Sequence, residues 1–227
     1  PERMRPHDLK GYVGQRHLIG EGCILRNMIE SGNLSSFILW GPPGVGKTTL
    51  SRIVAKSMGR DFHTLSAVSA GVKDVRDVID RARSNSLFSN GTAPILFIDE
   101  IHRFNKSQQD ALLGAVEDGT VVLVGATTEN PSFEVITPLL SRCQVFVLKS
   151  LENDDLLQLL ERALKEDEVL KYKNIKVNET DALFRHSAGD ARKLLNILEI
   201  VVGACSGKQE IVIDNKTVTS CLQENIA

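Results

Sequence analysis

The sequence lacks paired cysteines. Its four cysteines, Cys23, Cys143, Cys205 and Cys221, lie far apart, with no C-x-x-C pair and no histidine at the spacing of a zinc site. Such isolated cysteines indicate neither a disulfide framework nor a zinc finger. We expect reduced, partly buried thiols with no catalytic role, because the strong functional signals lie elsewhere.

Long apolar runs are also missing. The first thirty residues contain nothing like the apolar segment of a signal peptide, and no run approaches the ~20 apolar residues that cross a bilayer. We therefore expect a cytoplasmic protein with no membrane partner.

Charge of one sign is not in excess either. The formal net charge is −2 and the isoelectric point is about 6.3, so the chain has no overall basic field that would attract nucleic acid. Contact with DNA would need a local basic patch or several copies of the chain. With 227 residues and 42% apolar residues, the sequence has enough material for one large domain, or for one domain and a smaller companion.

A glycine-rich segment follows the first clear apolar run. Residues 36–40 have the composition of a buried strand, Gly41, Gly44 and Gly46 permit a tight turn, and Thr48 begins a helical pattern. Residues 41–48 match G-x-x-x-x-G-K-[ST], whose backbone N–H groups hold phosphates at a helix N-terminus. A glycine-rich turn before an ordinary helix is the alternative, and the strand-loop-helix context favours nucleotide binding.

This interpretation gives each residue of the loop a role. Lys47 would reach the β- and γ-phosphates of ATP, and the Thr48 hydroxyl would be a ligand of Mg²⁺. The predicted nucleotide contacts are Gly41, Pro42, Pro43, Gly44, Val45, Gly46, Lys47, Thr48 and Thr49.

A second acidic motif ends another predicted strand. Residues 95–98 are apolar and are followed by Asp99 and Glu100. Carboxylates at the carboxyl ends of buried parallel strands lie where ligands bind in open α/β sheets. Asp99 would hold Mg²⁺ through water, and Glu100 would deprotonate the water that attacks the γ-phosphate. Two acidic residues that merely end a strand are the alternative.

Other candidates come from single positions. Thr128, after the predicted strand 121–126, would contact the γ-phosphate, although threonines at strand ends are often structural. Arg142, before the predicted strand 145–148, would either form a surface ion pair or enter the nucleotide site of a neighbouring subunit. Tyr12 and Val13, in the arm formed by residues 1–20, would cover the adenine, and a plain surface arm is the alternative.

The character of the sequence changes near Lys149. We predict a nucleotide-binding domain over residues 1–149 and a helical domain over residues 150–227. Within the second, Asn178 and Asp190 are predicted helix caps, and residues 175–177 and 211–213 a hairpin-like strand pair. Arg192 falls in the first helical turn after Asp190, where a cation opposes the helix dipole unless it meets an anion. Phosphate is one such anion, and a surface carboxylate is the alternative.

Several basic residues could touch DNA. Lys73 and Arg76 lie on a predicted helix that also carries aspartates, and Arg103 and Lys106 follow the acidic pair. Mixed charge is usually just a solvated helix face.

Five motifs occur in the order GPPGVGKT, ILFIDE, GATTEN, LLSRC and GDARKLL. With them the chain resembles an AAA+ ATPase of the clamp-loader and branch-migration-motor clade. The segments RMRPHDLKGYVGQ, EIHRFNKSQQDALL and GATTENPSFE closely resemble the replication-associated recombination protein A family. Its members are the bacterial relatives of the Werner-helicase-interacting ATPases, which protect and restart stalled replication forks.

This resemblance implies an α/β fold of the P-loop AAA+ type. It has a five-stranded parallel sheet in the order 5-1-4-3-2 and a small helical lid. The resemblance makes Lys47 and Thr48 the Walker A contacts, Asp99 and Glu100 the Walker B pair, Thr128 sensor 1, Arg142 a finger acting in trans and Arg192 sensor 2. The adenine-proximal arm of the family falls on Tyr12 and Val13, and clamp-loader relatives make Lys73 and Arg76 plausible DNA contacts.

The implied function is a DNA-dependent ATPase that acts at stalled or gapped replication forks in restart and recombination. Its cofactors would be ATP or ADP and Mg²⁺. Its partners would be single-stranded, gapped or forked DNA, a single-strand-binding protein, and copies of itself. Family members form tetramers through a further C-terminal segment, so a sequence that stops at Ala227 would be an ATPase core. A clamp-loader subunit and a nucleotide-gated recruitment scaffold with little turnover remain alternatives.

Overall fold

The computed structural model describes residues 1–86, 92–205 and 209–224. The chain forms two compact units. The sheet unit contains His7–Gly41 and Lys47–Leu148, and the helical unit contains Pro1–Pro6, Pro42–Gly46 and the described residues from Lys149 onward. The change of unit after Leu148 coincides with the change in sequence character.

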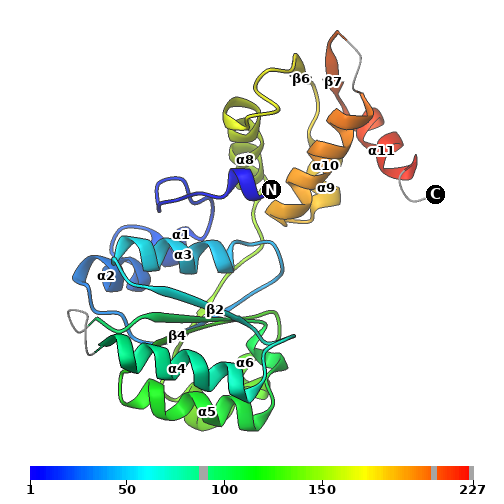
Figure 1. Ribbon diagram of the computed structural model, residues 1–227. Helices are drawn as coiled ribbons and strands as arrows, with labels where there is room; N and C mark the ends of the chain where they lie inside the picture. The colour runs from blue at the N-terminus through cyan, green and yellow to red at the C-terminus, as the bar shows by residue number, and fades with distance from the viewer. Residues whose placement is uncertain (87–91, 206–208, 225–227) are drawn as a thin grey trace. The chain divides into compact units, whose positions relative to one another are not determined.

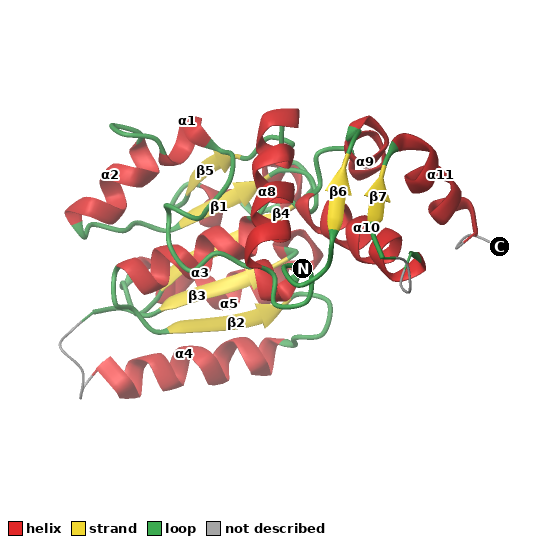
Figure 2. Cartoon of the chain, turned by 90° about the horizontal axis from the view of Figure 1, so that it is seen from above, coloured by secondary structure: helices red, strands yellow, loops and turns green. Residues whose placement is uncertain are grey.

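The sheet unit is built around five parallel strands (Figure 2). They lie in the order β2-β3-β4-β1-β5, so the predicted order 5-1-4-3-2 is confirmed. The strands are β1 Phe37–Trp40, β2 Phe62–Ser66, β3 Ile95–Asp99, β4 Val122–Thr127 and β5 Gln144–Val147.

Helices cover both faces of this sheet. In Figure 1, α2 and α3 lie on one side of the strands, and α4 and α5 lie on the other. The helical segments are α1 Arg16–Ile19, α2 Ile24–Ser31, α3 Lys47–Ser57, α4 Val72–Ser86, the 3₁₀ turn η2 Ile101–Arg103, α5 Lys106–Glu117, α6 Pro131–Glu134 and α7 Thr137–Leu140.

The burial of the strands on both faces explains why they are visible in the sequence as apolar runs. Parallel strands with helices on both faces are continuous apolar runs, and residues 95–98 of β3 are all 0% exposed. On α4, Val75, Ile79 and Ala82 recur at helical spacing and are buried against the sheet side of the core. The ends of the elements differ from the sequence boundaries by a few residues, as helix and strand ends usually do.

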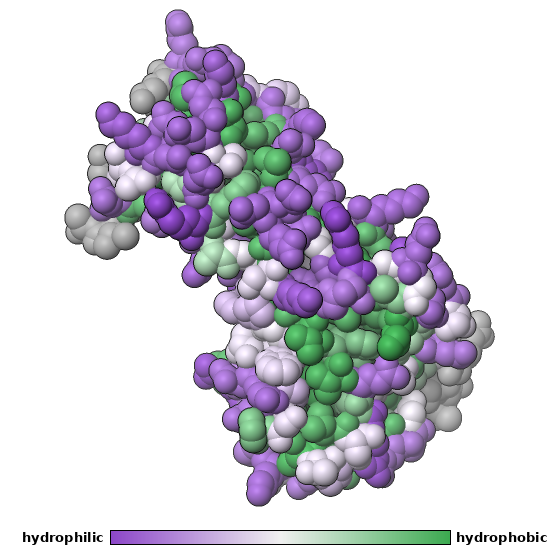
Figure 3. Space-filling view, turned by 180° about the vertical axis from the view of Figure 1, so that it is seen from behind, coloured by the Kyte–Doolittle hydropathy of each residue, from purple (hydrophilic) through white to green (hydrophobic). Residues whose placement is uncertain are grey.

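The β5 edge of the sheet carries exposed apolar side chains, although His17 Nε2 lies 2.8 Å from Val147 O and covers part of it. Along this strand Phe146 is buried, whereas Val145 and Val147 are 40% and 47% exposed. Ile24 of α2 is a further exposed apolar side chain of the sheet unit. Figure 2 places β5 at the side of the unit that faces the viewer in Figure 3, where apolar residues form a patch.

The helical unit has its own apolar core, made mainly by leucines of α8 and α10. Figure 1 shows its helices and a two-stranded sheet. Its elements are η1 Glu2–Met4, α8 Asn153–Glu166, β6 Ile175–Val177, α9 Asp181–Ser187, α10 Ala191–Ala204, β7 Ile211–Ile213 and α11 Asn215–Glu224.

The structure corrects two predictions in this unit. The strands β6 and β7 pair in parallel and therefore do not form a hairpin, because α9 and α10 separate them in sequence. Asn178 does not cap α9, because the helix begins at Asp181 and its N-cap residue is Thr180, whereas the Asn178 N–H donates to Ile213 O at 2.9 Å and continues the strand pairing. The helix instead receives a cap from Asn215, whose Oδ1 accepts from the Ala182 N–H at 2.7 Å. The predicted cap at Asp190 is present, since its carboxylate accepts from the N–H groups of Arg192 and Lys193.

The predicted arm of residues 1–20 is divided between the units. Met4 is buried in the helical core, and Arg3 Nε donates to Asp167 Oδ2 at 2.9 Å. Arg3 also reaches Glu199, at 2.8 Å. The first six residues thus pack with the helices, and only the arm from His7 onward belongs to the sheet unit. Within the described part of the chain, no helix is long and apolar enough to span a membrane.

Candidate nucleotide site

The phosphate loop joins β1 to α3. Gly41 N–H donates to Thr127 O of β4 at 3.1 Å, which fixes the start of the loop to the neighbouring strand. Lys47, only 8% exposed, folds back so that its Nζ donates to Gly41 O at 2.6 Å. The first turn of α3 contains no acidic residue, so the helix N-terminus is suited to an anion.

The tip of the loop requires glycine at position 44. Gly44 has a φ of 69°, and a Cβ there would lie 1.8 Å from Asp190 Oδ1. Pro42–Gly46 and the start of α10 belong to the same compact unit, in which Ala191 N–H donates to Gly44 O at 3.1 Å. Arg192, the next residue, is exposed.

The acidic pair ends β3. Asp99 is level with Ser66 of β2, and Ile98 is level with Gly125 of β4. The carboxylate of Asp99 therefore lies at the edge of the sheet where β1 and β4 also end. Glu100 has a left-handed backbone, with φ 56° and ψ 47°, which is costly for any residue with a side chain and is found mainly at functional sites.

The structure adds a residue that the sequence analysis did not select. His102 Nδ1 lies 3.0 Å from Thr127 Oγ1 and 3.3 Å from Glu100 Oε2. Thr127 is fully buried, whereas Thr128 is half-buried and follows it at the tip of β4. Thr127 thus has a structural role, because its buried hydroxyl bonds to the backbone of Glu129. Thr128 remains the predicted phosphate contact. The signal available in the sequence was a histidine two residues after Glu100.

Arg142 lies before β5, beside the exposed sheet edge. Its Nη1 donates to Pro138 O at 2.6 Å, and its Nη2 forms an ion pair with Glu117 at the end of α5. In the single chain Arg142 therefore forms a surface ion pair with Glu117. This is one of the two possibilities named in the sequence analysis, the other being entry into the site of a neighbouring subunit. Its role in trans stays a prediction.

The remaining candidates differ in exposure. Tyr12 is 8% exposed, and burial raises the pKa of its hydroxyl, so the side chain is uncharged near neutral pH; its contact with adenine stays a prediction. Val13 is half-buried. The four basic candidates for DNA contact, Lys73, Arg76, Arg103 and Lys106, are all exposed.

The donor set suits Mg²⁺ bound together with a nucleotide. Mg²⁺ usually takes one or two protein oxygens and completes its shell with phosphates and water. The Thr48 hydroxyl and the Asp99 carboxylate provide such oxygens at the start of α3 and the end of β3. Within residues 1–86, 92–205 and 209–224, no group of three or more His, Cys, Asp or Glu could hold a metal by itself.

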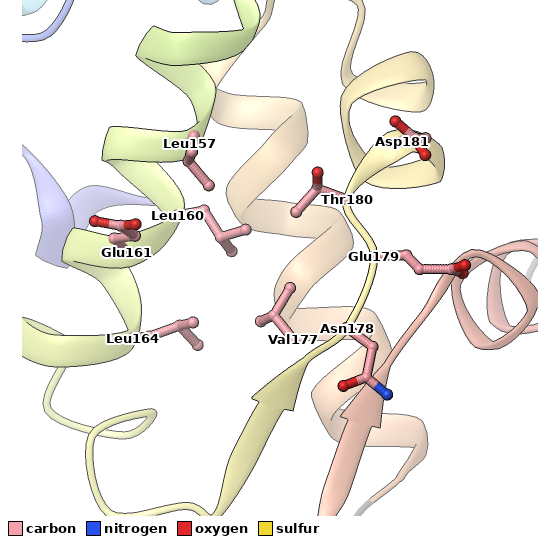
Figure 4. A pocket seen from close by; sticks show the side chains of 9 residues that line it. All are labelled: Leu157, Leu160, Glu161, Leu164, Val177, Asn178, Glu179, Thr180 and Asp181. Atoms are coloured by element: carbon pink, nitrogen blue, oxygen red, sulfur yellow. The ribbon is translucent and has the colours of Figure 1, made fainter.

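A groove of about 440 Å³ lies in the helical unit, between α8 and the segment that joins β6 to α9 (Figure 4). Leucines of α8 and Val177 line it together with three acidic residues, Glu161, Glu179 and Asp181. Glu179 already accepts a hydrogen bond from the backbone of Asn215. An acidic lining repels phosphates, so this groove is no alternative nucleotide site.

Comparison with known proteins agrees with this geometry. Residues 37–151 match the family described as "ATPase family associated with various cellular activities (AAA)". The chain belongs to this AAA family. The matched segment runs from β1 to the residues just after β5, so it includes the phosphate loop, the acidic pair and the tip of β4.

The relatives of this AAA chain include proteins named for replication and recombination. It is 48% identical over 228 residues to the replication-associated recombination protein A of Coxiella burnetii, covering 99% of this chain and 51% of that protein. It is 50% identical over 203 residues to the Escherichia coli K12 protein of the same name, covering 88% of this chain and 45% of that protein. The chain thus spans about half the length of these curated relatives.

A solved structure with a similar fold is the Thermotoga maritima RuvB Holliday junction branch migration motor. It has a TM-score of 0.78 and 27% sequence identity, and the match covers 98% of this chain and 73% of that one. The AAA fold and the resemblance to the replication-associated recombination protein A family are therefore confirmed. The roles of individual site residues stay predictions.

Proposed function

We propose that this chain is the ATPase core of a DNA-dependent AAA ATPase that acts at stalled or gapped replication forks. The observation that carries the proposal is the common position of Gly41, where the phosphate loop begins, and of Asp99, Glu100 and Thr128 at the carboxyl ends of adjacent parallel strands of the sheet unit. The replication and recombination proteins among the relatives support the biological context.

The chain's own side chains divide the reaction among them. Lys47 and the N–H groups that open α3 bind the β- and γ-phosphates, and Thr48 and Asp99 hold Mg²⁺. When bound, Mg²⁺ neutralises charge on the phosphates. Glu100 orients a water and accepts its proton as the water attacks the γ-phosphate. Thr128 donates a hydrogen bond to that phosphate, and Tyr12 and Val13 pack against the adenine.

Two arginines respond to the nucleotide in this proposal. Arg192 contacts the phosphates from the start of α10. Arg142 leaves Glu117 and enters the site of a neighbouring subunit, where an arginine finger speeds turnover by about 10³ or more. The apolar β5 edge beside Arg142 supports this step, since a neighbouring subunit docked there would bury Val145 and Val147.

DNA would bind along an assembly of several copies. Because one chain carries a net charge of −2, affinity should depend on assembly and fall as salt rises. The exposed residues Lys73, Arg76, Arg103 and Lys106 are the proposed contacts.

A mixing experiment tests the proposal in a form of the protein that assembles. We expect Arg142→Ala to bind ATP normally and to lose turnover. Lys47→Ala, in contrast, should lose ATP binding while keeping its own finger. Mixed oligomers should recover turnover, because an intact finger meets an intact site. Failure to recover in demonstrably mixed oligomers would remove the trans finger.

The DNA part needs a separate measurement. ATP hydrolysis by the assembled protein should increase with forked, gapped or single-stranded DNA at low salt, and a panel of DNA substrates with and without a sliding clamp measures this. Stimulation only by a clamp at a primer junction would favour a clamp-loader subunit. Equal, background rates for wild type and Glu100→Gln would favour a recruitment scaffold.

A further inference from the structure

A short basic segment with one exposed aromatic ring joins α8 to β7's partner strand β6 in the helical unit (Figure 1). Within residues 169–178 the charged side chains are three lysines, Lys171, Lys173 and Lys176, and all three are exposed. Tyr172, between the first two, is 81% exposed. A ring that lies mostly in water among lysines has both parts of a nucleic-acid contact, a flat face for a base and cations for phosphates.

The ring of Tyr172 already has a cation on one of its faces. The Lys171 ammonium lies over the ring, 5.0 Å from its centroid, where the electrons of the aromatic face attract it. The ring thus keeps its other face for a planar ligand and holds a positive charge beside that ligand. Such a site favours a ligand that combines an aromatic face with negative charge, as a nucleotide in a DNA strand does.

The backbone of the segment is fixed on both sides of the ring. Asp167 Oδ1 accepts from the N–H groups of Val169 and Leu170 at 2.9 and 3.1 Å, and the Asp167 carbonyl accepts from the Lys171 N–H at 3.0 Å. Leu170 is buried in the helical core, and β6, which follows the turn, pairs with β7. Because the turn is held in place, Tyr172 loses little conformational freedom on binding, which favours affinity.

The carboxylates around the segment limit how far its charge acts. Asp167 is engaged by Arg3, whereas Glu168 and Glu210 are exposed, one just before the segment and one just before β7. At physiological salt the screening length is about 8 Å. The lysines therefore assist a strand that is already stacked on Tyr172, and they do not attract duplex DNA from a distance.

The exposed ring selects the form of DNA. Inside a duplex each base is stacked between its neighbours, so the ring finds a free base face only on an unpaired strand or at a duplex end. We propose that residues 169–178 form a second DNA-binding site, in which Tyr172 stacks on an unpaired base and the three lysines contact the adjoining phosphates. This inference rests on the proposed DNA-dependent function, and it adds a single-strand site made by the helical unit to the basic residues of the sheet unit.

Variants of Tyr172 test the stacking in a form of the protein that assembles. Fluorescence anisotropy with a labelled oligothymidylate strand should give a Kd about tenfold higher for Tyr172→Ala, as expected for a lost stacking contact. Tyr172→Phe keeps the ring and should stay within about twofold of wild type. Binding to a covalently closed duplex, which offers no free base face, should be the same in all three proteins.

The same variants have a stability control. Because the ring is mostly in water, both should unfold at the urea concentration that unfolds wild type. Equal losses of strand affinity in Tyr172→Ala and Tyr172→Phe would overturn the proposal, because the ring would then be irrelevant. No loss in Tyr172→Ala would overturn it as well.

The salt dependence of binding tests the lysines. On a single strand each phosphate contact contributes about 0.7 to the slope of log K against log salt concentration. Lys173→Gln should therefore lower the magnitude of this slope by about 0.7 or more. Lys56→Gln, the same change at an exposed lysine in the last turn of α3, is the matched control and should leave the slope unchanged. Equal slopes for the two variants would remove the phosphate contacts.

A cross-link locates the contact in wild-type protein. An oligothymidylate strand that carries 5-iododeoxyuridine should, under near-ultraviolet light, become attached to the peptide that contains Tyr172. Replacing Lys73, Arg76, Arg103 and Lys106 by glutamine should weaken binding and still leave this cross-link at saturating strand. Cross-links confined to peptides of the sheet unit would overturn the proposal.

The outcomes distinguish this inference from the proposed function. If single-stranded DNA stimulates ATP hydrolysis and Tyr172→Ala binds the strand like wild type, only this inference fails. If the strand binds through Tyr172 and no DNA raises the rate of hydrolysis, the DNA-dependent ATPase fails and the site stands. If wild type does not bind the strand at all, the site is excluded directly, and the hydrolysis measurements alone decide the ATPase.

Discussion

At the scale of single residues, the site depends on a few side chains held in unusual positions. Glu100 combines a left-handed backbone with the predicted catalytic carboxylate, and Lys47 is almost fully buried with its ammonium on the Gly41 carbonyl. Such arrangements cost folding free energy and persist only when the surrounding structure enforces them. The cost at Glu100 can be measured directly.

Glu100→Gly should give a more stable protein than Glu100→Ala. Both variants lose the carboxylate, but only alanine keeps a Cβ in the left-handed region, which costs about 1–2 kcal/mol. The greater freedom of glycine in the unfolded chain offsets part of this, so the expected net difference is about 0.5–1 kcal/mol. Urea denaturation midpoints would measure it.

Asp110, exposed on α5, provides the control for this comparison. In a helix interior glycine is less favourable than alanine by about 1 kcal/mol, so the order of the two variants should reverse there. If the difference in stability between the Gly and Ala variants had the same sign at both positions, it would contradict the left-handed backbone conformation of Glu100.

At the scale of elements, the two units differ in how their segments are joined. The sheet unit is held by strands that pair over most of their length, whereas the helical unit combines an apolar core with caps and ion pairs between distant segments. Asn215 caps α9, and Arg3 joins η1 to Asp167, which follows α8. Asp167 also accepts from the N–H groups of Val169 and Leu170.

These contacts make the stability of the helical unit depend on pH. Burial raises the pKa of Asp167, but the hydrogen bond from Arg3 and those from the two backbone N–H groups lower it more, so the net shift is downward. A carboxyl with a lowered folded pKa contributes stability above its unfolded pKa of about 3.9, and the contribution is lost as pH falls through the folded value.

We therefore expect the difference in unfolding free energy between wild type and Asp167→Asn to be largest near neutral pH and to shrink below about pH 4. Urea titrations of the two proteins between pH 3 and pH 7 would measure this difference, in which the other carboxyls largely cancel. A difference that stayed constant across the range would mean that the ion pair contributes nothing.

At the scale of the whole molecule, the β5 edge is the surface through which we expect copies of the chain to associate. Val145 and Val147 are exposed side chains of β5, which lies at the end of the sheet and pairs with β1. Figure 3 shows an apolar patch on the face of the sheet unit where β5 lies. An edge strand with apolar exposed residues invites pairing with another chain.

Val145→Asp should weaken self-association in a form of the protein that assembles, by about tenfold or more in dissociation constant, or about 1.4 kcal/mol. Analytical ultracentrifugation would measure it. Val145→Thr, which keeps the branched shape and adds no charge, is the control and should assemble nearly as well. The unfolding free energy should change by less than about 0.5 kcal/mol, as for most surface substitutions. Unchanged assembly in Val145→Asp would exclude this edge.

Much of the fold could be predicted from the sequence because its signals are local. The apolar run before Asp99 and the spacing of Val75, Ile79 and Ala82 identify a buried strand and a helix face without knowledge of the rest. The order of the strands and the identity of the family are implied by the resemblance; the sheet of this structure confirms the order, and the comparisons confirm the family.

The features that could not be predicted are contacts between distant segments. The cap of α9 comes from Asn215, more than thirty positions later, and the parallel pairing of β6 with β7 has no local pattern to distinguish it from a hairpin. The bond between His102 and Thr127 likewise requires β3 and β4 to be neighbours. Local spacing contains no information about such partners.

The docking of the first six residues affects how the protein is made. Arg3 leaves the ribosome before any of the sheet unit, yet its partners Asp167 and Glu199 are translated 164 and 196 positions later. The turn η1 therefore has no partner available while the parallel sheet forms, since domains generally fold as they emerge. A nascent chain halted before Asp167 would present Met4 to solvent and to chaperones, and completing the helical unit would withdraw it.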